Sequence, residues 1–276
     1  MYLWLGVKTV FCTCLSDSKN NNFEKVRSQY EVRRTGTLPS AASESSGLAR
    51  GKDVNSFWTH NDSGGKAELY EIDSAGKFLS VKKIDGATNT DWEDLAQEPD
   101  GTLYIGDFGN NNNTRRTLDI YKLPPNNADV EKIAFSYKDQ KAFPPASDKL
   151  IYDCEAFFYS NKSLYLFSKN LSTGNHYVRL YQMPAEKGTY TLSPIDSIRI
   201  NTQVTSADIS PDGKTFALLT YGKVLLFGIE NGNINFKRPL GCFRLVKKQA
   251  EAIVFLNDSD MLITNEQREI FRVTRQ

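Results

Sequence analysis

Short apolar segments and polar turns alternate along the chain in a pattern that repeats. Each copy contains an apolar segment preceded by a carboxylate or a serine, a turn, a second strand ending in a polar loop, and a third strand rich in aromatic and aliphatic residues. Apolar runs of this length, bounded by Gly, Asn, Asp and Ser, predict β-strands joined by tight turns. The five copies begin with ESSGLAR at Glu44, DWEDLAQ at Asp91, DCEAFFY at Asp153, TSADIS at Thr205 and QAEAIVF at Gln249.

The spacing between the copies predicts the architecture. If one apolar residue of each copy is superimposed, the intervals between them are 47, 62, 52 and 44 residues. That is the length of a four-stranded blade of a β-propeller, whereas leucine-rich and hexapeptide solenoids have shorter periods. We therefore expect an all-β chain with five four-stranded blades. The superimposed residues are Leu48, Leu95, Phe157, Ile209 and Ile253.

The two ends of the repeat region indicate how the ring closes. The fifth copy stops after three strands at Gln276, and a strand-like segment, residues 30–38, precedes the first copy. A propeller closes when one terminus supplies the missing strand of the last blade, which also removes exposed sheet edges. We expect one domain over residues 28–276. The copy that begins at Asp153 is long enough to contain extra strands, so six blades are an alternative.

Composition adds few constraints. The chain has 276 residues, 39% of them hydrophobic, and 34 Lys plus Arg against 33 Asp plus Glu, a net charge of +1. A charge balance this even gives no basic excess with which to neutralise phosphates, so we expect no nucleic-acid partner. We expect a monomer.

The N-terminal residues 1–27 resemble a leader and tether. Met1–Val10 are apolar apart from Lys8, too short a run to span a bilayer, and a polar stretch follows Cys14. An apolar run, a small residue and a cysteine are typical of a lipoprotein signal, which predicts an extracytoplasmic protein, periplasmic or at the cell surface, with lipid attachment at Cys14. A frayed cytoplasmic tail is the alternative. We expect Cys154 and Cys242 to be two buried free thiols rather than a disulfide, and neither has the CxxC partner of a zinc site.

The repeat places carboxylates at equivalent positions. The residues two before the superimposed apolar ones are Ser46, Glu93, Glu155, Ala207 and Glu251. The first strand of each blade lines the central channel, so these side chains should converge on the axis. Crowded carboxylates repel one another, and a bound cation relieves this. Oxygen ligands without His or Cys favour Ca²⁺, held by Glu93, Glu155, Glu251 and Ser46.

Two features of the sequence allow alternatives to this metal site. The carboxylates could instead bond to backbone amides or to Lys and Arg in a water-filled channel. Ala207 departs from the pattern, so Ser206, Asp208 or a backbone carbonyl would have to serve in the fourth blade. Asp91 and Asp153 lie two residues earlier on the same face and are expected nearer the channel mouth.

The loops after the second strands should lie on the same rim as the metal site. They contain Asp107, Asp62 and His60, which we predict as catalytic groups that position water. Acid, amide and cationic groups beside them predict binding of a small anionic ligand. The predicted substrate-binding residues are Asn61, Asn110, Arg115, Arg116, Lys169 and Glu266. Alternatively, these loops carry Asn, Gly and Asp because hairpins require them, and GNNNNT is then a flexible tip. Two histidines and no G-x-S-x-G argue against a serine hydrolase triad.

The motifs ESSGLA, THNDSGG, DWEDLA and GDFGNN resemble a group of uncharacterised bacterial secreted propeller proteins, over most of residues 38–123. More remotely, the order Ser46, Glu93, Glu155, Glu251, with LYIG after the second copy, is similar to the five-bladed calcium-activated nucleotidases, or apyrases. That resemblance implies a channel Ca²⁺ held by these four residues. It does not imply nucleotide hydrolysis, because no nucleotide-binding set is matched.

Two functions follow from these observations. The first is a calcium-dependent hydrolase of a small anionic phosphoanhydride, ester or lactone. The second is a non-catalytic propeller that binds a ligand or a protein and uses Ca²⁺ only to stabilise the ring.

Overall fold

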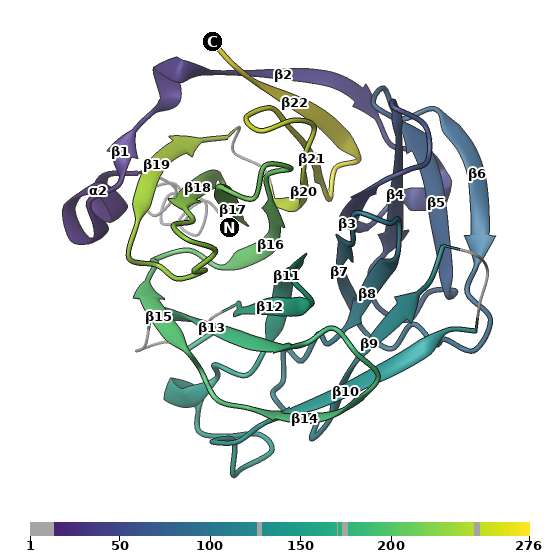
Figure 1. The fold of residues 1–276 in the computed structure, drawn as a ribbon, viewed down its shortest axis with the longest axis vertical. Helices are drawn as coiled ribbons and strands as arrows, with labels where there is room; N and C mark the ends of the chain where they lie inside the picture. The colour runs from purple at the N-terminus through teal and green to yellow at the C-terminus, as the bar shows by residue number, and fades with distance from the viewer. Residues whose placement is uncertain (1–13, 126–128, 170, 173–175, 246–248) are drawn as a thin grey trace, which may run out of the picture.

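A computed structural model describes residues 14–125, 129–169, 171–172, 176–245 and 249–276. Five β-sheets stand around a central channel, and their innermost strands contact one another in a closed ring (Figure 1). The predictions of an all-β chain and a five-bladed β-propeller are confirmed. No helix in these ranges is long and apolar enough to cross a membrane.

The blades follow one another along the chain, each running from the channel outward. The first blade consists of β3 (Ser45–Arg50), β4 (Ser56–Asn61), β5 (Glu68–Asp73) and β6 (Phe78–Lys83). The second consists of β7 (Trp92–Gln97), β8 (Leu103–Asp107), β9 (Leu118–Leu123) and β10 (Glu131–Tyr137). The third consists of β11 (Cys154–Ser160), β12 (Ser163–Ser168), β13 (Tyr177–Pro184) and β15 (Asp196–Arg199).

The fourth blade consists of β16 (Val204–Ile209), β17 (Thr215–Thr220), β18 (Lys223–Gly228) and β19 (Pro239–Arg244). In the fifth, β20 (Ala250–Phe255), β21 (Met261–Asn265) and β22 (Glu269–Arg275) are completed by β2 (Tyr30–Thr37), which pairs antiparallel with β22. The predicted closure by an N-terminal strand is confirmed. Short 3₁₀ turns η1 (Arg27–Gln29), η2 (Ser40–Ala42) and η3 (Ser147–Lys149) connect the strands.

The extra length of the third copy does not form a sixth blade. It forms β14 (Gly188–Leu192), which crosses to the second blade and pairs in parallel with β10. The fourth blade gains an outer strand in the same way, because β1 (Glu24–Lys25) pairs in parallel with β19.

Apolar residues fill the spaces between neighbouring blades, one cluster to each space. Successive residues of a strand point to opposite faces, so one strand contributes to two clusters. In β17, Phe216 and Leu218 face the third blade, whereas Ala217 and Leu219 face the fifth. The nearly continuous apolar sequence of this strand reflects burial on both faces.

Residues 14–27 are not a tether, which corrects the predicted leader boundary. The helix α2 (Leu15–Asn21), β1 and η1 pack on the outer side of the ring next to β19. Cys14 forms a disulfide with Cys242, and Lys223, fully buried, forms an ion pair with the carboxylate of Asp17. The prediction of two free thiols is therefore wrong for Cys242, while Cys154 is a free, buried thiol. Residues 1–13 of the predicted leader lie outside the described ranges.

Candidate metal centre at the channel mouth

Every innermost strand carries a β-bulge near its first residue. The pairing with the second strand shifts there in all five blades. A bulge adds one residue to a strand and re-aims its side chain. The residues at these shifts are Ser46, Glu93 with Asp94, Glu155, Thr205 and Glu251.

This register corrects the alignment of the fourth blade. Thr205, and not Ala207, is equivalent to the channel carboxylates, and its hydroxyl donates to the Ala250 carbonyl at 2.8 Å. Ala207 packs in the apolar cluster between the third and fourth blades. The Ser206 hydroxyl bonds to the Asp94 carboxylate at 3.0 Å, so Ser206 does not replace a ligand.

Asp94 is a buried carboxylate that joins the inner strands of three blades. Its Oδ2 accepts the backbone N–H groups of Phe157 at 3.2 Å and Ala207 at 3.1 Å. Ser206 in turn accepts the N–H of Ile253 at 3.1 Å, which extends the network to the fifth blade. The sequence did not predict this role, because nothing in DWEDLA distinguishes Asp94 from the other two acidic residues.

The four predicted channel ligands line one cavity. Ser46, Glu93, Glu155 and Glu251 surround a space of about 380 Å³ at the start of the inner strands. The loops that follow the second strands contribute Asp62, Asn111, Lys169, Tyr221 and Glu266 to the same cavity. The prediction that both sets share one mouth of the channel agrees with this geometry.

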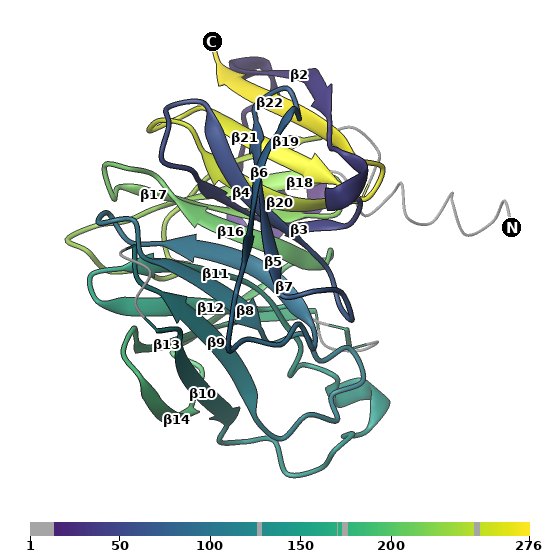
Figure 2. The ribbon, with the colours of Figure 1, turned by 90° about the vertical axis from the view of Figure 1, so that its right-hand side faces the viewer.

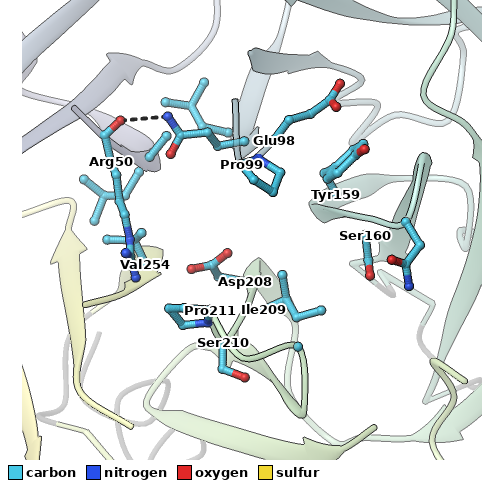
Figure 3. A pocket seen from close by; sticks show the side chains of 16 residues that line it. Arg50, Glu98, Pro99, Tyr159, Ser160, Asp208, Ile209, Ser210, Pro211 and Val254 are labelled. Atoms are coloured by element: carbon cyan, nitrogen blue, oxygen red, sulfur yellow. Dashed lines mark hydrogen bonds between the residues drawn. The ribbon is translucent and has the colours of Figure 1, made fainter. Parts of the chain in front are cut away.

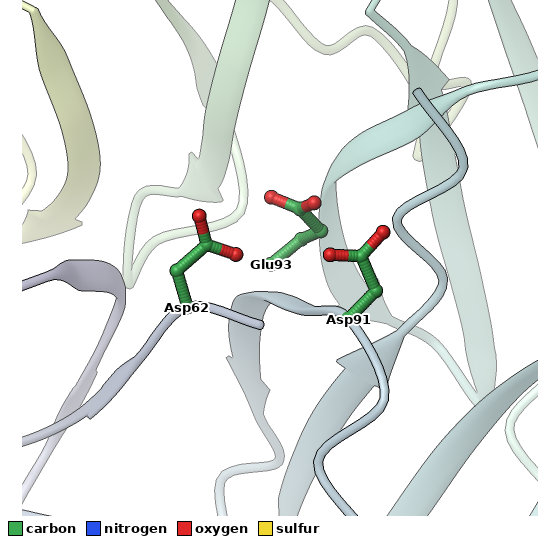
Figure 4. Close-up of side chains that lie close together, drawn as sticks. All are labelled: Asp62, Asp91 and Glu93. Atoms are coloured by element: carbon green, nitrogen blue, oxygen red, sulfur yellow. The ribbon is translucent and has the colours of Figure 1, made fainter. Parts of the chain in front are cut away.

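Three carboxylates within this region meet closely. One oxygen from each of Asp62, Asp91 and Glu93 lies within 4.8 Å of the other two (Figure 4). Asp62 comes from the loop after β4, while Asp91 and Glu93 lie just before and in β7. Among the described His, Cys, Asp and Glu residues, this is the group with the spacing of a metal site. The group includes Glu93 of the predicted shell, whereas Glu155, Glu251 and Ser46 lie outside it.

Gly109 makes the close approach of two of these carboxylates sterically feasible. A Cβ atom at this position would lie 2.2 Å from Glu93 Oε1 and 2.5 Å from Asp91 Oδ2. The Gly109 N–H donates to the Asp91 carbonyl at 3.1 Å, and Asp107 Oδ1 accepts the Asp91 N–H at 3.0 Å. The GDFG segment therefore forms the wall against which Asp91 and Glu93 rest.

Two carboxyl groups of the trio keep their protons more readily than exposed carboxyl groups do. Burial, with the negative charges of Asp62 and Glu155, raises the pKa of Asp91 to about 6. Burial and the charges of Glu155 and Asp62 raise the pKa of Glu93 well above its usual value. Deprotonated carboxylates this close need a compensating positive charge.

Lys169 supplies one positive charge, but at another carboxylate. Its Nζ lies 2.6 Å from Glu155 Oε1, and both side chains are buried. The Lys169 ammonium group thus neutralises the Glu155 carboxylate. A channel carboxylate paired with Lys or Arg was the alternative to a bound metal in the sequence analysis. Lys169 lines the cavity as predicted, although its charge is already engaged.

Glu251 lies in the same cavity and retains a proton more readily than an exposed glutamate. Burial and the charges of Glu155 and Glu266 raise its pKa to about 9. Glu266 is held by Gln249, whose Nε2 donates to Glu266 Oε1 at 2.7 Å.

His60 does not reach the cavity, which corrects its predicted catalytic role. The residue is completely buried, and its ring packs edge-on against Trp92 with 5.5 Å between centroids. Its Nδ1 lies 2.9 Å from the Asn61 carbonyl, and burial lowers its pKa to about 4. His60 is a neutral core residue between the first two blades.

Asp107 and Arg115 bind each other rather than a substrate. Arg115 donates to the Gly109 carbonyl at 2.9 Å and to Asp107 Oδ1 at 3.3 Å. Asp107 is 1% exposed, so it does not position water at the rim as predicted. Arg116 is exposed, but it stacks on Phe143 at 4.4 Å and does not line the cavity.

The amide residues of the rim also have structural roles. Asn61 accepts the Glu44 N–H at 3.1 Å and donates to the Ala41 carbonyl at 2.8 Å. The buried Asn110 donates its N–H to Asp153 Oδ1 at 2.6 Å, and Asn113 accepts the Tyr152 N–H at 2.9 Å. The GNNNNT segment is therefore anchored to the third blade at Asn110 and Asn113, and the interpretation as a flexible tip is wrong there.

The opposite mouth of the channel contains a different cavity, of about 350 Å³ (Figure 3). Arg50 and Asp208 line it, and both hold Phe255. Arg50 Nε donates to the Phe255 carbonyl at 3.0 Å, and Asp208 Oδ2 accepts the Phe255 N–H at 2.7 Å. Asp208, considered as a ligand for the fourth blade, thus lies away from the metal centre.

The chain matches no protein-family model and no curated protein. Solved structures similar to it include a virginiamycin B lyase from Staphylococcus aureus, with 14% identity over 87% of this chain and 69% of that chain, at a TM-score of 0.42. A gluconolactonase from Xanthomonas campestris has 13% identity over 80% of this chain and 69% of that chain, at a TM-score of 0.50. The latter likeness concerns the propeller fold alone. The resemblance to calcium-activated nucleotidases stays a prediction.

Proposed function

We propose that this propeller binds Ca²⁺ through Asp62, Asp91 and Glu93 and hydrolyses small esters or lactones in the adjoining cavity. The observation that carries the proposal is the convergence of these three carboxylates within 4.8 Å of one another, two of which, Asp62 and Glu93, line a cavity of about 380 Å³.

The three side chains suit a hard cation. Their ligand atoms are all oxygen, and they come from two segments of the chain. Gly109, which has no side chain, leaves room for Asp91 and Glu93. Ca²⁺ accepts oxygen ligands in flexible geometry and completes its coordination with water or substrate. A bound Ca²⁺ would polarise a carbonyl oxygen and stabilise the charge that develops on it.

The negative charge of the cavity argues against an anionic substrate. The arginines expected to hold an anionic group are engaged elsewhere, and Lys169 is paired with Glu155. Glu44, Glu251 and Glu266 line the remaining wall. A phosphoanhydride would meet these carboxylates, so we propose an uncharged ester or lactone in place of the anionic substrate expected from the sequence.

The chain itself can supply a proton for the leaving group. Glu251 faces the cavity and holds a proton near neutral pH. A protonated carboxyl beside the scissile bond can act as a general acid. Lys169 pairs with the Glu155 carboxylate, so Glu155 carries a charge that helps to raise the pKa of Glu251.

We also propose an extracytoplasmic location. The support is the Cys14–Cys242 disulfide, since such bonds persist in oxidising compartments. The same sulfur cannot carry a lipid, so this proposal does not include a lipid anchor at Cys14.

A specific observation favours the second function, a non-catalytic propeller with a structural Ca²⁺. His60 and Asp107, expected to position water, are buried in the fold. The proposed hydrolysis therefore depends on the carboxyl groups of the cavity, whereas a ligand-binding role needs no catalytic group.

The test combines calcium titration with turnover. Calorimetric titration of the wild type with Ca²⁺ should show one site, and an Asp62→Asn, Glu93→Gln double variant should lose it. Aryl esters, lactones and nucleotides are then assayed with Ca²⁺ and with chelator. Ester or lactone turnover that chelator abolishes supports the hydrolase.

Calcium binding without turnover of any probe would favour the non-catalytic function. Glu44→Gln is a matched control, because it changes an exposed cavity glutamate outside the trio. Retention of calcium by the double variant would refute the metal site in both functions.

A further inference from the structure

The cavity at the opposite mouth of the channel, here called the far cavity, is separate from the metal centre. The metal centre lies at the starts of the inner strands and the far cavity at their ends, in a ring that Figure 1 shows along the channel and Figure 2 from the side. All five blades contribute to its lining. Its volume of about 350 Å³ lies within the usual range for small-molecule sites, roughly 300–1,000 Å³.

Apolar side chains from four blades form part of this lining. Leu48, Leu95 and Val254 are only 2%, 3% and 4% exposed, so they present little apolar surface outside the cavity. Covering the apolar surface that remains would favour a ligand with a compact apolar part. The apolar residues of the inner strands and of the turns that follow them are Leu48, Leu95, Ile209, Val254, Pro99 and Pro211.

Two opposite charges line the far cavity without pairing with each other. Arg50 donates two N–H groups to the Phe255 carbonyl, at 3.0 and 2.6 Å, and Asp208 Oδ2 accepts the N–H of the same residue at 2.7 Å. Among the described residues, neither Arg50 nor Asp208 forms an ion pair. The backbone of Phe255 therefore holds both charged groups side by side at the cavity (Figure 3).

Both groups keep hydrogen-bonding capacity for a ligand. The guanidinium of Arg50 has further N–H donors, and the partly buried carboxylate of Asp208 accepts several hydrogen bonds. Burial raises the pKa of Asp208 to about 6, so its carboxyl group is mostly ionised at neutral pH. Glu98, the other carboxylate of the lining, is engaged, because it accepts the Tyr104 hydroxyl and lies 3.6 Å from Lys122 Nζ.

We propose that the far cavity binds a free α-amino acid with an apolar side chain. The ligand carboxylate would accept hydrogen bonds from Arg50, its ammonium group would donate to Asp208, and its side chain would cover the apolar lining. This site is independent of the metal centre and of the proposed hydrolysis.

The proximity of the two charges favours a zwitterion over an ion of one sign. An apolar acid bound to Arg50 would bring its carboxylate close to Asp208, and an apolar amine bound to Asp208 would bring its ammonium group close to Arg50. Like charges brought together in this way are unfavourable. In an α-amino acid the two charged groups are attached to one carbon atom, so each meets its opposite charge.

The probe is L-leucine, and three analogues each lack one of its parts. Isocaproate lacks the ammonium group, isoamylamine lacks the carboxylate, and glycine lacks the side chain. Calorimetric titration of the wild type at neutral pH, with chelator present, keeps ligand carboxylates from binding to calcium at the metal centre. Leucine should bind at least about tenfold tighter than each analogue, because each analogue loses one set of contacts.

Nuclear magnetic resonance locates the bound leucine. In nitrogen–proton correlation spectra, the amide signals of Phe255 and Ile209 should move as leucine is added. The signals of Asp62 and Glu93 at the metal centre should stay in place. Because calcium is absent, this result does not depend on whether the protein is a hydrolase.

Two variants remove one charge each. Asp208→Asn keeps an acceptor for the Phe255 N–H and should weaken leucine binding about tenfold without weakening isocaproate binding. Arg50→Gln should weaken leucine binding to a similar degree, about tenfold, without weakening isoamylamine binding. Lys52→Gln and Asp53→Asn are matched controls in the exposed β3–β4 loop, outside the far cavity, and should bind leucine like the wild type.

Four outcomes would overturn the proposal. Absence of leucine binding up to its solubility limit would exclude the site, and isocaproate or isoamylamine binding as tightly as leucine would show that one charge suffices. Movement of the metal-centre signals alone would place leucine elsewhere. Unchanged leucine affinity in a folded Asp208→Asn protein would exclude the ammonium contact. The comparison of analogues on the wild type tests the proposal even if Arg50→Gln does not fold.

Discussion

At the residue scale, Arg115 and Arg116 are adjacent in the chain but differ in what they touch. Arg115 binds Asp107 and the Gly109 carbonyl, and these two residues hold the backbone of Asp91. Arg116 stacks on Phe143. Partners that orient metal ligands typically change metal affinity 10- to 100-fold when removed. Arg115 is therefore a positioning residue for the proposed metal centre.

This contrast gives a prediction with a built-in control. Arg115→Gln should weaken calcium binding by about tenfold, because Asp107 and the loop would no longer fix Asp91. Arg116→Gln should bind calcium like the wild type. Calorimetric titration measures both. Equal affinities for the two variants would show that the arginine does not position the site, even if the wild type binds calcium.

Asp208 predicts a pH dependence of stability at the other mouth of the channel. Burial raises its pKa to about 6, above the value near 3.9 in an unfolded chain, despite the nearby Arg50. The folded state then binds the proton more tightly, so this group's contribution to stability falls as pH rises from about 4 to about 6.

Asp208→Asn keeps an oxygen acceptor for the Phe255 N–H and removes the titration. Its free energy of unfolding relative to wild type should rise by about 1–3 kcal/mol between pH 4 and pH 7. Urea unfolding at both pH values measures the difference. A difference that does not change with pH would contradict the raised pKa.

At the scale of elements, α2 is attached to the ring by a few strong contacts. The disulfide Cys14–Cys242 and the buried pair of Asp17 with Lys223 hold its first turn, and the Phe23 ring after the helix meets Phe227 at 5.1 Å. Release of the helix would leave the buried Lys223 ammonium without its carboxylate, which is costly.

Cys14→Ser should therefore lower the free energy of unfolding by about 2–5 kcal/mol, the usual cost of losing a native disulfide. Thermal unfolding with and without reductant measures the effect. Reductant should lower the melting temperature of the wild type and leave that of the variant unchanged. Identical melting of the two oxidised proteins would show that the disulfide does not form.

At the scale of the whole molecule, closure of the ring depends on β2. The strand pairs with β22 along Tyr30–Thr37, and Tyr30 stacks on Phe243 of the fourth blade at 4.5 Å. Without β2, the apolar strand β22 would become an open edge and the fifth blade would lose its fourth strand.

A chain that starts at Tyr30 should fold with reduced stability, whereas one that starts at Leu38 should not give a cooperative transition. Both lack α2 and the disulfide, so the comparison isolates β2. Circular dichroism during urea unfolding distinguishes the two, and an added peptide of residues 30–37 should partly restore the shorter chain. Equal cooperativity of both chains would show that closure does not need this strand.

Much of the architecture could be predicted from local patterns. The five copies, their spacing and the missing fourth strand of the last copy led to the propeller and its closure. The presence of Glu93, Glu155 and Glu251 in one channel mouth also followed, since position within a repeat determines position around the ring. These properties depend on the order of the repeats along the chain, and the periodic sequence pattern reveals that order.

Contacts between distant segments were decided by the tertiary structure alone. The bulges that align Thr205 with the channel glutamates, the pairing of Lys169 with Glu155, and the disulfide joining Cys14 to Cys242 leave no periodic signal. The burial of His60 and Asp107 likewise depends on how neighbouring blades pack. Periodicity fixes which residues repeat, whereas the partner of a given side chain depends on distances between segments that only the folded ring brings together.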